Sequence, residues 1–392
     1  MSRAVPFIDT PGALRGLCER LAGAPWLALD TEFIRERTYR PRLCLVQVAT
    51  PETLACIDPL AVELEPLLEV LFEPQRTLVM HAARQDLEIF YQLRGRLPAR
   101  VFDTQLAAPL LGLPEQIGYA GLVKALLGVE LGKGHARTDW CARPLTAGQL
   151  AYAADDVRYL ARLYPELRRR LEACGRLDWL EEEFAALRDP AGYETPEAEA
   201  WRRIKGIGRL KGRSLAIAQA LAAWRERTAR EADLPRRWVL DDEALLGIAR
   251  LAPRTKAELR RVRGPREDRL AKYADAILAV VAKARDRAPE PLAEGRRPPP
   301  LEPAQEAAID LLAGALRLLA ERHRIHPNVL ANRKALEQLV RGERDLPLLR
   351  GWRRELAGEH LLAVLEGREA VTIVDGRLQF VHADTHRPHP PR

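Results

Sequence analysis

The pattern of apolar and polar positions separates a first part with strand signals from a remainder that is helical. Five segments of the first part are short, apolar or alternating, and bounded by turn-like sequence: Trp26–Phe33, Leu43–Thr50, Thr53–Ile57, Thr77–Met80 and Arg100–Phe102. The first three follow one another closely, which predicts a β-meander. Gln85–Leu93 and Thr146–Leu171 carry apolar residues at helical spacing. This order of elements predicts an α/β domain with a mixed sheet.

The rest of the chain shows helical spacing and lacks convincing strands until Val371–Val381. The predicted helices are Ser214–Arg230, Asp242–Leu251, Pro303–His323 and Ala331–Arg341, with Asp242 as an N-cap. Two stretches, 188–197 and 286–302, are rich in Pro and in acidic residues or Gly, which predicts linkers. We therefore expect a first domain over residues 1–187 and two small all-α bundles over residues 198–285 and 303–392.

Composition narrows the class of protein. With 392 residues the chain is too long for one compact domain, and 47% hydrophobic residues are typical of globular proteins. The chain has no apolar run of about 18 residues and no secretion signal, so we expect a cytoplasmic protein without a membrane partner. Five scattered cysteines without a C-x-x-C pair are expected to be reduced thiols rather than disulfides or zinc ligands. No G-x-x-x-x-G-K-[ST] loop for a nucleoside triphosphate occurs, which excludes a motor.

The positive charge is concentrated in the second predicted domain. The chain carries a net charge of +7, whereas residues 198–285 alone hold 22 Lys and Arg against 11 Asp and Glu. Such an excess suits a polyanion such as nucleic acid, and a solubilising basic face is the alternative interpretation. Six cations around a Gly206-Ile-Gly208 turn are candidate phosphate contacts: Arg202, Arg203, Lys205, Arg209, Lys211 and Arg213.

Asp30 and Glu32, in the first predicted strand, are candidate metal ligands. Residues i and i+2 of a strand share a face, so the two carboxylates project together while Thr31 points away. A divalent cation would relieve their repulsion and desolvation, since hard cations prefer carboxylate oxygen. A solvated strand edge is the alternative explanation for this pair.

Two further motifs bring acidic residues to predicted helices. Asp86 lies in the first turns of its helix, where it can also serve merely to complement the helix dipole. Tyr152 and Asp156 are four residues apart and therefore share a helix face, on which a tyrosine beside a metal-binding carboxylate can orient a water molecule. Core packing of Tyr152 and surface exposure of Asp156 are the alternative. Asp155, about 100° around the helix, is expected to face solvent.

In this order the motifs resemble the three exonuclease motifs of the DEDD superfamily, in its tyrosine subtype. Flanking residues are similar to the ribonuclease D family in Asp30-Thr-Glu-Phe, His81…Gln85-Asp-Leu-Glu, Val101-Phe-Asp-Thr-Gln105 and Lys133…Thr138-Asp-Trp140. Trp201-Arg-Arg-Ile-Lys-Gly resembles the HRDC domain that follows the nuclease in that family. The implied fold is an α/β ribonuclease H-like exonuclease domain with a mixed sheet, followed by two small HRDC-like bundles.

The resemblance implies an enzyme that shortens RNA from its 3′ end and releases nucleoside 5′-monophosphates, with 3′-extended tRNA precursors as the leading substrate. It also implies two divalent ions, Mg²⁺ or Mn²⁺. The implied catalytic residues are Asp30, Glu32, Asp86 and Asp156 as metal ligands and Tyr152 as the group that orients water.

His81 and Gln105 are candidate contacts to the RNA 3′ end, and Lys133 and Arg137 are candidate phosphate contacts. For the last two, exposed loop cations are the alternative. A DNA-directed 3′–5′ exonuclease and a catalytically silent RNA-binding scaffold are the alternative functions.

Overall fold

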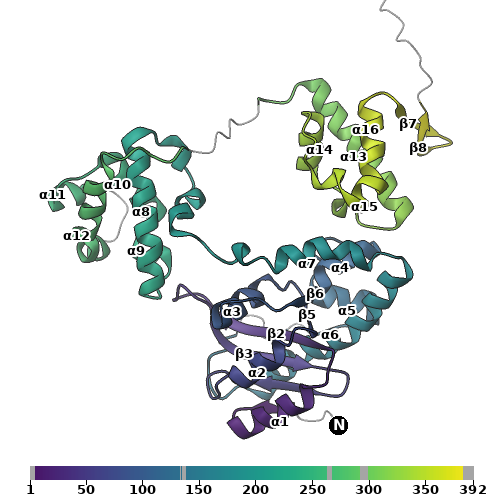
Figure 1. The fold of residues 1–392 in the computed structure, drawn as a ribbon, viewed down its shortest axis with the longest axis horizontal. Helices are drawn as coiled ribbons and strands as arrows, with labels where there is room; N and C mark the ends of the chain where they lie inside the picture. Colours follow the sequence, from purple (N-terminus) through teal and green to yellow (C-terminus); the bar gives the residue numbers. More distant parts are fainter. Residues whose placement is uncertain (1–4, 133, 135–137, 263–266, 292–298, 383–392) are drawn as a thin grey trace, which may run out of the picture.

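The computed structural model describes residues 5–132, 134, 138–262, 267–291 and 299–382 (Figure 1). One small cluster of buried apolar residues covers positions between 44 and 154, and three larger clusters lie in the ranges 8–187, 200–284 and 309–361. We refer to the parts built around the three larger clusters as the α/β domain, the first helical domain and the second helical domain. No helix of the described residues is long and apolar enough to cross a membrane.

A six-stranded mixed sheet forms the centre of the α/β domain, as predicted. Its strands lie in the order β1-β4-β3-β2-β5-β6. β2, β3 and β4 pair antiparallel as the predicted meander, whereas β5 pairs parallel with β2 and β6, and β1 pairs parallel with β4. The strands are β1 Phe7–Ile8, β2 Trp26–Ile34, β3 Arg42–Ala49, β4 Leu54–Ile57, β5 Thr77–Met80 and β6 Arg100–Asp103.

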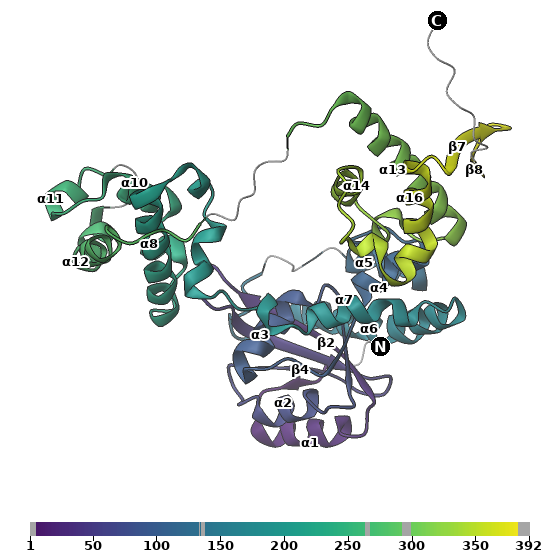
Figure 2. The same ribbon diagram turned by 45° about the horizontal axis from the view of Figure 1, so that its top comes forward.

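Helices cover both sides of this sheet, with α1 and α2 on one side and α6 and α7 on the other (Figure 2). The long helix α6 packs against β2, β3, β4 and β5. The helices are α1 Pro11–Leu21, α2 Glu65–Leu71, α3 Arg84–Arg94, α4 Thr104–Ala107, α5 Tyr119–Leu127, α6 Ala147–Ala173 and α7 Glu181–Leu187. Single 3₁₀ turns at Ala108–Leu111 and Leu177–Leu180 follow α4 and precede α7.

The first helical domain contains α8 Gly212–Glu231, α9 Arg236–Val239, α10 Asp242–Leu251, α11 Lys256–Leu259 and α12 Glu267–Ala284. The 3₁₀ turns Pro190–Gly192, Glu197–Arg203 and Ile207–Arg209 lead into it. We had expected Asp242 to be the N-cap of α10, but it is the first residue of the helix. Asp241 is the cap, because its side chain accepts a hydrogen bond of 2.8 Å from the backbone N–H of Ala244.

The second helical domain contains α13 Pro303–His323, α14 Arg333–Val340, α15 Gly351–Arg353 and α16 Glu359–Leu365, with a π-helical turn at Arg354–Gly358 and 3₁₀ turns at Pro327–Val329 and Pro347–Leu349. The strand-like segment near its end forms a hairpin of β7 Glu369–Val374 and β8 Arg377–His382. Val371 and Phe380 pack against the helical core, while Ile373 at the far end of the hairpin is 69% exposed.

Both helical domains are anchored on the α/β domain, at different places (Figures 1 and 2). The first is held by the segment between β2 and β3. The hydroxyl of Tyr39 donates to Glu226, and the guanidinium of Arg236 lies 4.7 Å from the Tyr39 ring. The backbone N–H groups of Tyr39 and Arg40 each donate to the Asp233 carboxylate over 3.1 Å.

The second helical domain is anchored through two stacked indole rings. The rings of Trp179 and Trp352 are parallel within 6°, with their centroids 4.4 Å apart. Beside the stack, Arg353 pairs with Glu182 over 3.0 Å and with Glu183. Because aromatic stacking and ion pairs occur together here, this contact fixes the second helical domain next to α7.

Contrary to the expectation of reduced cysteines throughout, Cys44 and Cys141 form a disulfide. The two residues are 97 positions apart in the sequence, so no local motif announces the pair. Arg143 explains their meeting: its guanidinium donates to both carboxylate oxygens of Asp58, each over 2.6 Å, and to the carbonyl of Cys44 over 2.7 Å. These contacts hold the segment before α6 against β3. Cys18, Cys56 and Cys174 are free thiols.

Candidate active site

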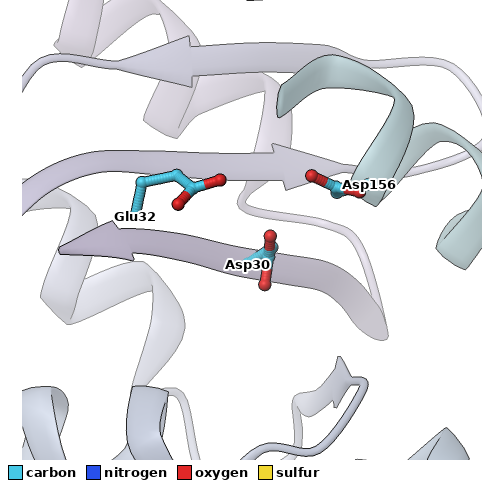
Figure 3. Close-up of side chains that lie close together, drawn as sticks. All are labelled: Asp30, Glu32 and Asp156. Atoms are coloured by element: carbon cyan, nitrogen blue, oxygen red, sulfur yellow. The ribbon is translucent and has the colours of Figure 1, made fainter. Parts of the chain in front are cut away.

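Three carboxylates from two distant parts of the sequence converge between the sheet and α6. Asp30 and Glu32 extend from β2 and Asp156 from α6, and one oxygen of each lies within 4.8 Å of the others (Figure 3). The pairing of β2 with β3 is irregular between Glu32 and Phe33. Such bulges change the direction of a side chain, and here the bulge directly follows the second carboxylate.

The start of α6 is fixed by its sequence, which in turn fixes Asp156. Thr146 and Gln149 form a reciprocal capping box, in which each side chain bonds the backbone N–H of the other. The hydroxyl of Tyr119 donates to the backbone carbonyl of Asp155 over 3.0 Å and also to that of Asp156. Burial, followed by the negative charge of Asp156, raises the pKa of Tyr119 far above its ordinary value, so this hydroxyl stays a donor.

Asp86 lies close to the other carboxylates but belongs to a separate contact. It is in the first turn of α3, is 6% exposed, and accepts a hydrogen bond from the Thr31 hydroxyl. We had expected Thr31 to point away from the site. Thr31 lies between Asp30 and Glu32, so one strand supplies two ligands of the carboxylate cluster and, between them, the residue that binds Asp86.

Asp103 holds the start of α3 in place. One of its carboxylate oxygens accepts the backbone N–H of Ala82 at 3.0 Å and of Gln105 at 2.8 Å, and the other accepts that of Ala83 at 2.8 Å. Ala82 has φ +58°, a left-handed conformation that costs a non-glycine residue about 1–2 kcal/mol. The three charge-assisted bonds offset this cost and so determine where Asp86 is presented.

Burial and mutual repulsion raise the pKa values of the carboxyl groups. For Asp30, burial comes first, followed by repulsion from Asp86, Asp156 and Glu32, and the pKa is well above its ordinary range. Burial and then the charge of Asp156 raise the pKa of Glu32 to about 8. Burial is also the main cause for Asp86 and Asp156, each with a pKa raised to about 7.

This donor set fits a hard divalent cation. Carboxylate oxygens are the ligands that Mg²⁺ and Ca²⁺ prefer, and an ion about 2.0–2.6 Å from each ligand allows oxygens to be as much as roughly 5 Å apart. The separations between the oxygens of Asp30, Glu32 and Asp156 fall within that limit. A cation would also neutralise the repulsion that raises their pKa values.

Tyr152 lies one turn before Asp156 on α6, as its spacing predicts. Burial, followed by the charges of Asp156, Glu32 and Asp30, raises the pKa of Tyr152 to about 12. Its ring lies beside Trp140, with centroids 6.1 Å apart, and this contact limits the positions that the ring can take. Asp155, in contrast, is partly exposed and pairs with Arg158, as expected for the residue that faces solvent.

Comparison with known proteins connects this geometry with a family. The 3′–5′ exonuclease family matches residues 5–172, and the HRDC domain family matches residues 214–281. The chain is 42% identical to ribonuclease D of Gluconacetobacter diazotrophicus, over 96% of this chain and 97% of that protein. It is also 42% identical to ribonuclease D of Acidiphilium cryptum, over 96% of each chain. The chain belongs to the ribonuclease D family.

A solved member of the ribonuclease D family confirms the fold class. The crystal structure of Escherichia coli RNase D, described as an exoribonuclease involved in structured RNA processing, matches with a TM-score of 0.79 and 36% identity, over 93% of this chain and 99% of that one. The predicted exonuclease domain with a mixed sheet and the HRDC-type helical region are therefore confirmed. As a ribonuclease D, the chain is a 3′–5′ exoribonuclease, and RNA is its substrate.

The predicted contacts to the RNA 3′ end have partners inside the α/β domain. Nδ1 of His81 lies 2.9 Å from the hydroxyl oxygen of Thr104, and burial lowers the pKa of His81. The side-chain amide of Gln105 donates to the carbonyl of Ile117 over 3.2 Å. Their contacts with RNA stay predictions. Lys133 and Arg137 lie outside the described residues.

The six cations around the Gly206 turn are all exposed: Arg202, Arg203, Lys205, Arg209, Lys211 and Arg213. Gly206 has φ +89°, which only glycine adopts easily, so the turn depends on this residue. Arg202 is the one whose contacts are defined on both sides, 4.9 Å from the Trp201 ring and 4.0 Å from Glu290. Exposure makes these side chains available to phosphates, and their role in binding RNA stays a prediction.

Sequence reasoning missed three residues that support the site, namely Thr31, Asp103 and Tyr119. Asp103 had a usable signal, because an aspartate followed by Thr104 at the end of a strand is a common start for a helix. Thr31 and Tyr119 had none, since each acts on a residue that is far away in the sequence.

Proposed function

We propose that this ribonuclease D trims the 3′ ends of RNA in the cytoplasm, above all of tRNA precursors, by two-metal hydrolysis that releases nucleoside 5′-monophosphates. The observation that carries the proposal is the convergence of Asp30, Glu32 and Asp156 beside Tyr152. Neighbouring carboxylates without a counter-charge destabilise the fold, so their convergence favours a site that binds cations.

Each side chain has a distinct role in this proposal. Asp30, Glu32 and Asp156 bind the divalent ions, and Asp86, held by Thr31, completes the site for the second ion. When bound, the two ions supply Lewis-acid stabilisation of the attacking and leaving oxygens of an in-line displacement. Tyr152 keeps its proton at neutral pH, so its hydroxyl can hydrogen-bond the attacking water and orient it.

The first helical domain holds the RNA in this proposal. The excess of 22 basic over 11 acidic residues in positions 198–285 attracts phosphates by counterion release, which raises affinity without selecting a sequence. Structured RNA with a single-stranded 3′ extension, as in a tRNA precursor, would offer phosphates to this domain and a free end to the carboxylates.

The test compares Asp30→Asn with Asp155→Asn on a 3′-extended tRNA, with product analysis in the presence of Mg²⁺ and of EDTA. Asp30→Asn removes a charge from the cluster, and we expect a rate loss of at least about 10³-fold, with RNA affinity largely kept. Asp155→Asn also removes one negative charge, from the residue that precedes Asp156 and pairs with Arg158, and we expect near-normal trimming.

Three outcomes would contradict the proposal. Trimming that persists in Asp30→Asn would reject the assigned site, and trimming in EDTA would reject the metal ions. Faster turnover of a single-stranded DNA than of an RNA with the same length and sequence would reject RNA as the preferred substrate.

A further inference from the structure

An arginine-lined cleft lies between the α/β domain and the first helical domain, and it shares Arg203 with the cations around the Gly206 turn. Its volume is about 580 Å³. Five arginines line it: Arg35 and Arg84 from the α/β domain, and Arg203, Arg236 and Arg237 from the first helical domain. Glu36 and Glu88 are the acidic residues of its lining, so positive charge dominates the cleft.

One wall of this cleft belongs to the same elements as the catalytic carboxylates. Arg35 follows directly after β2, three residues beyond Glu32. Arg84 is the first residue of α3, two residues before Asp86. A strand of RNA that leaves the carboxylates past the end of β2 and the start of α3 therefore meets these two arginines first.

Two of the five arginines are already in ion pairs, because Arg35 lies 2.5 Å from Glu88 and Arg236 lies 2.5 Å from Glu226. Arg84 and Arg203 are the two whose contacts leave their charge available. Arg84 donates to the carbonyl of Gly192 over 2.8 Å and lies 5.4 Å from the Tyr193 ring, so an uncharged acceptor and an aromatic face fix it. Arg203 is exposed and has no ion-pair partner among the described residues. A guanidinium fixed in this way presents its remaining N–H groups to a phosphate at little entropic cost.

Two aromatic rings complete the lining. Tyr39 and Tyr193 are half-buried and border the same cleft. Fixed cations interleaved with aromatic faces are how proteins bind single-stranded nucleic acid without sequence preference, because every base can stack and every nucleotide carries a phosphate. Each ring already has a guanidinium beside it, Arg236 at Tyr39 and Arg84 at Tyr193, and a stacked base would add to these contacts. An acidic peptide would use the cations alone.

We propose that this cleft binds the single-stranded RNA segment upstream of the 3′ end, with its phosphates on the arginines and its bases against Tyr39 and Tyr193. The inference rests on the proposed function, because it takes the carboxylates as the position of the 3′ end. It assigns the upstream strand to a surface that both domains build together.

The test is binding of single-stranded RNA to the full chain, in an Asp30→Asn background that prevents cleavage. The cleft variant is Arg203→Gln/Arg237→Gln. The control is Arg250→Gln/Arg254→Gln, which removes the same charge from exposed positions in and just after α10, outside the cleft. Affinities are measured for RNAs of about 4 and about 16 nucleotides, the range of site sizes known for single-strand binding folds.

We expect the cleft variant to bind the longer RNA about 25-fold more weakly at 0.1 M salt, since each lost phosphate contact on a single strand removes about 0.7 from the salt exponent. The slope of log K against log salt should become shallower by about 1.4. The loss should be smaller for the shorter RNA and small for the control at both lengths. Arg203→Lys/Arg237→Lys, which keeps the charge, should recover most of the slope.

Equal losses in the cleft variant and the control would overturn the proposal, because the effect would then be one of net charge. An unchanged affinity of the cleft variant for the longer RNA would overturn it as well. Absence of metal-dependent trimming in the unmodified chain would instead reject the proposed function, so the two failures are distinguishable.

Discussion

Asp103→Asn should disable the enzyme without touching any group in the carboxylate cluster. The Asp103 carboxylate is 3% exposed and accepts three backbone N–H groups, from Ala82, Ala83 and Gln105. Asparagine keeps one acceptor oxygen and replaces the other with an NH₂ group. The N–H of Ala83 then faces a donor, while the bonds to Ala82 and Gln105 lose their charge assistance.

The expected cost follows from these three bonds. An unpartnered buried N–H costs about 1–3 kcal/mol, and a neutral acceptor gives bonds roughly half as strong as a charged one. Together these two losses amount to about 3 kcal/mol. A destabilisation of this size raises the equilibrium constant for local opening of α3 by roughly 10²-fold. Because Asp86 is in the first turn of α3, this opening displaces the carboxylate that the proposed function assigns to the second ion.

Hydrogen exchange followed by mass spectrometry measures this opening directly. We expect amides in the first turns of α3 to lose about 10²-fold in protection, with a parallel loss of 3′ trimming. Asp241→Asn is the matched control, since Asp241 caps α10 through a single N–H and asparagine caps a helix equally well. If Asp103→Asn kept full protection in α3, or lost trimming while α3 stayed protected, the positioning role of Asp103 would be refuted.

Two further predictions concern protons and thiols. Burial and repulsion raise the pKa values of Glu32 to about 8 and of Asp86 and Asp156 to about 7, so the metal-free folded state binds more protons than the unfolded chain. The stability of the metal-free protein should therefore fall as the pH rises from about 4.5 to about 8. The affinity for Mg²⁺ should rise over pH 6–8, and calorimetry should show that binding releases protons. A pH-independent Mg²⁺ affinity would contradict this reasoning. Alkylation of the denatured chain without reductant should label the three free thiols, Cys18, Cys56 and Cys174, and alkylation after reduction should label five. Five labelled thiols in both cases would show that the disulfide is absent.

The sequence predicted those features that depend on local periodicity. Thr77–Met80 and Pro303–His323 have the predicted bounds, because apolar spacing and turn residues determine such elements directly. The pairs Asp30/Glu32 and Tyr152/Asp156 were also found from spacing, since i, i+2 in a strand and i, i+4 in a helix share a face.

Features that depend on contacts between distant segments could not be predicted. The hydrogen bond from Thr31 to Asp86 joins residues 55 positions apart, and the Cys44–Cys141 disulfide joins residues 97 apart. Neither changes any local pattern. The interdomain cleft was missed for the same reason, because Arg35 and Arg237 show only as ordinary surface charges in the sequence.

The arrangement along β2 has a consequence for how this enzyme can vary. Three successive residues, Asp30, Thr31 and Glu32, serve two neighbouring acidic groups, so the pitch of one strand sets the spacing between them. Any substitution that shifts β2 displaces both groups together. Redesign of the enzyme for a larger or smaller ion is therefore better aimed at α3 and α6, because each helix can be adjusted while the position of β2 stays unchanged.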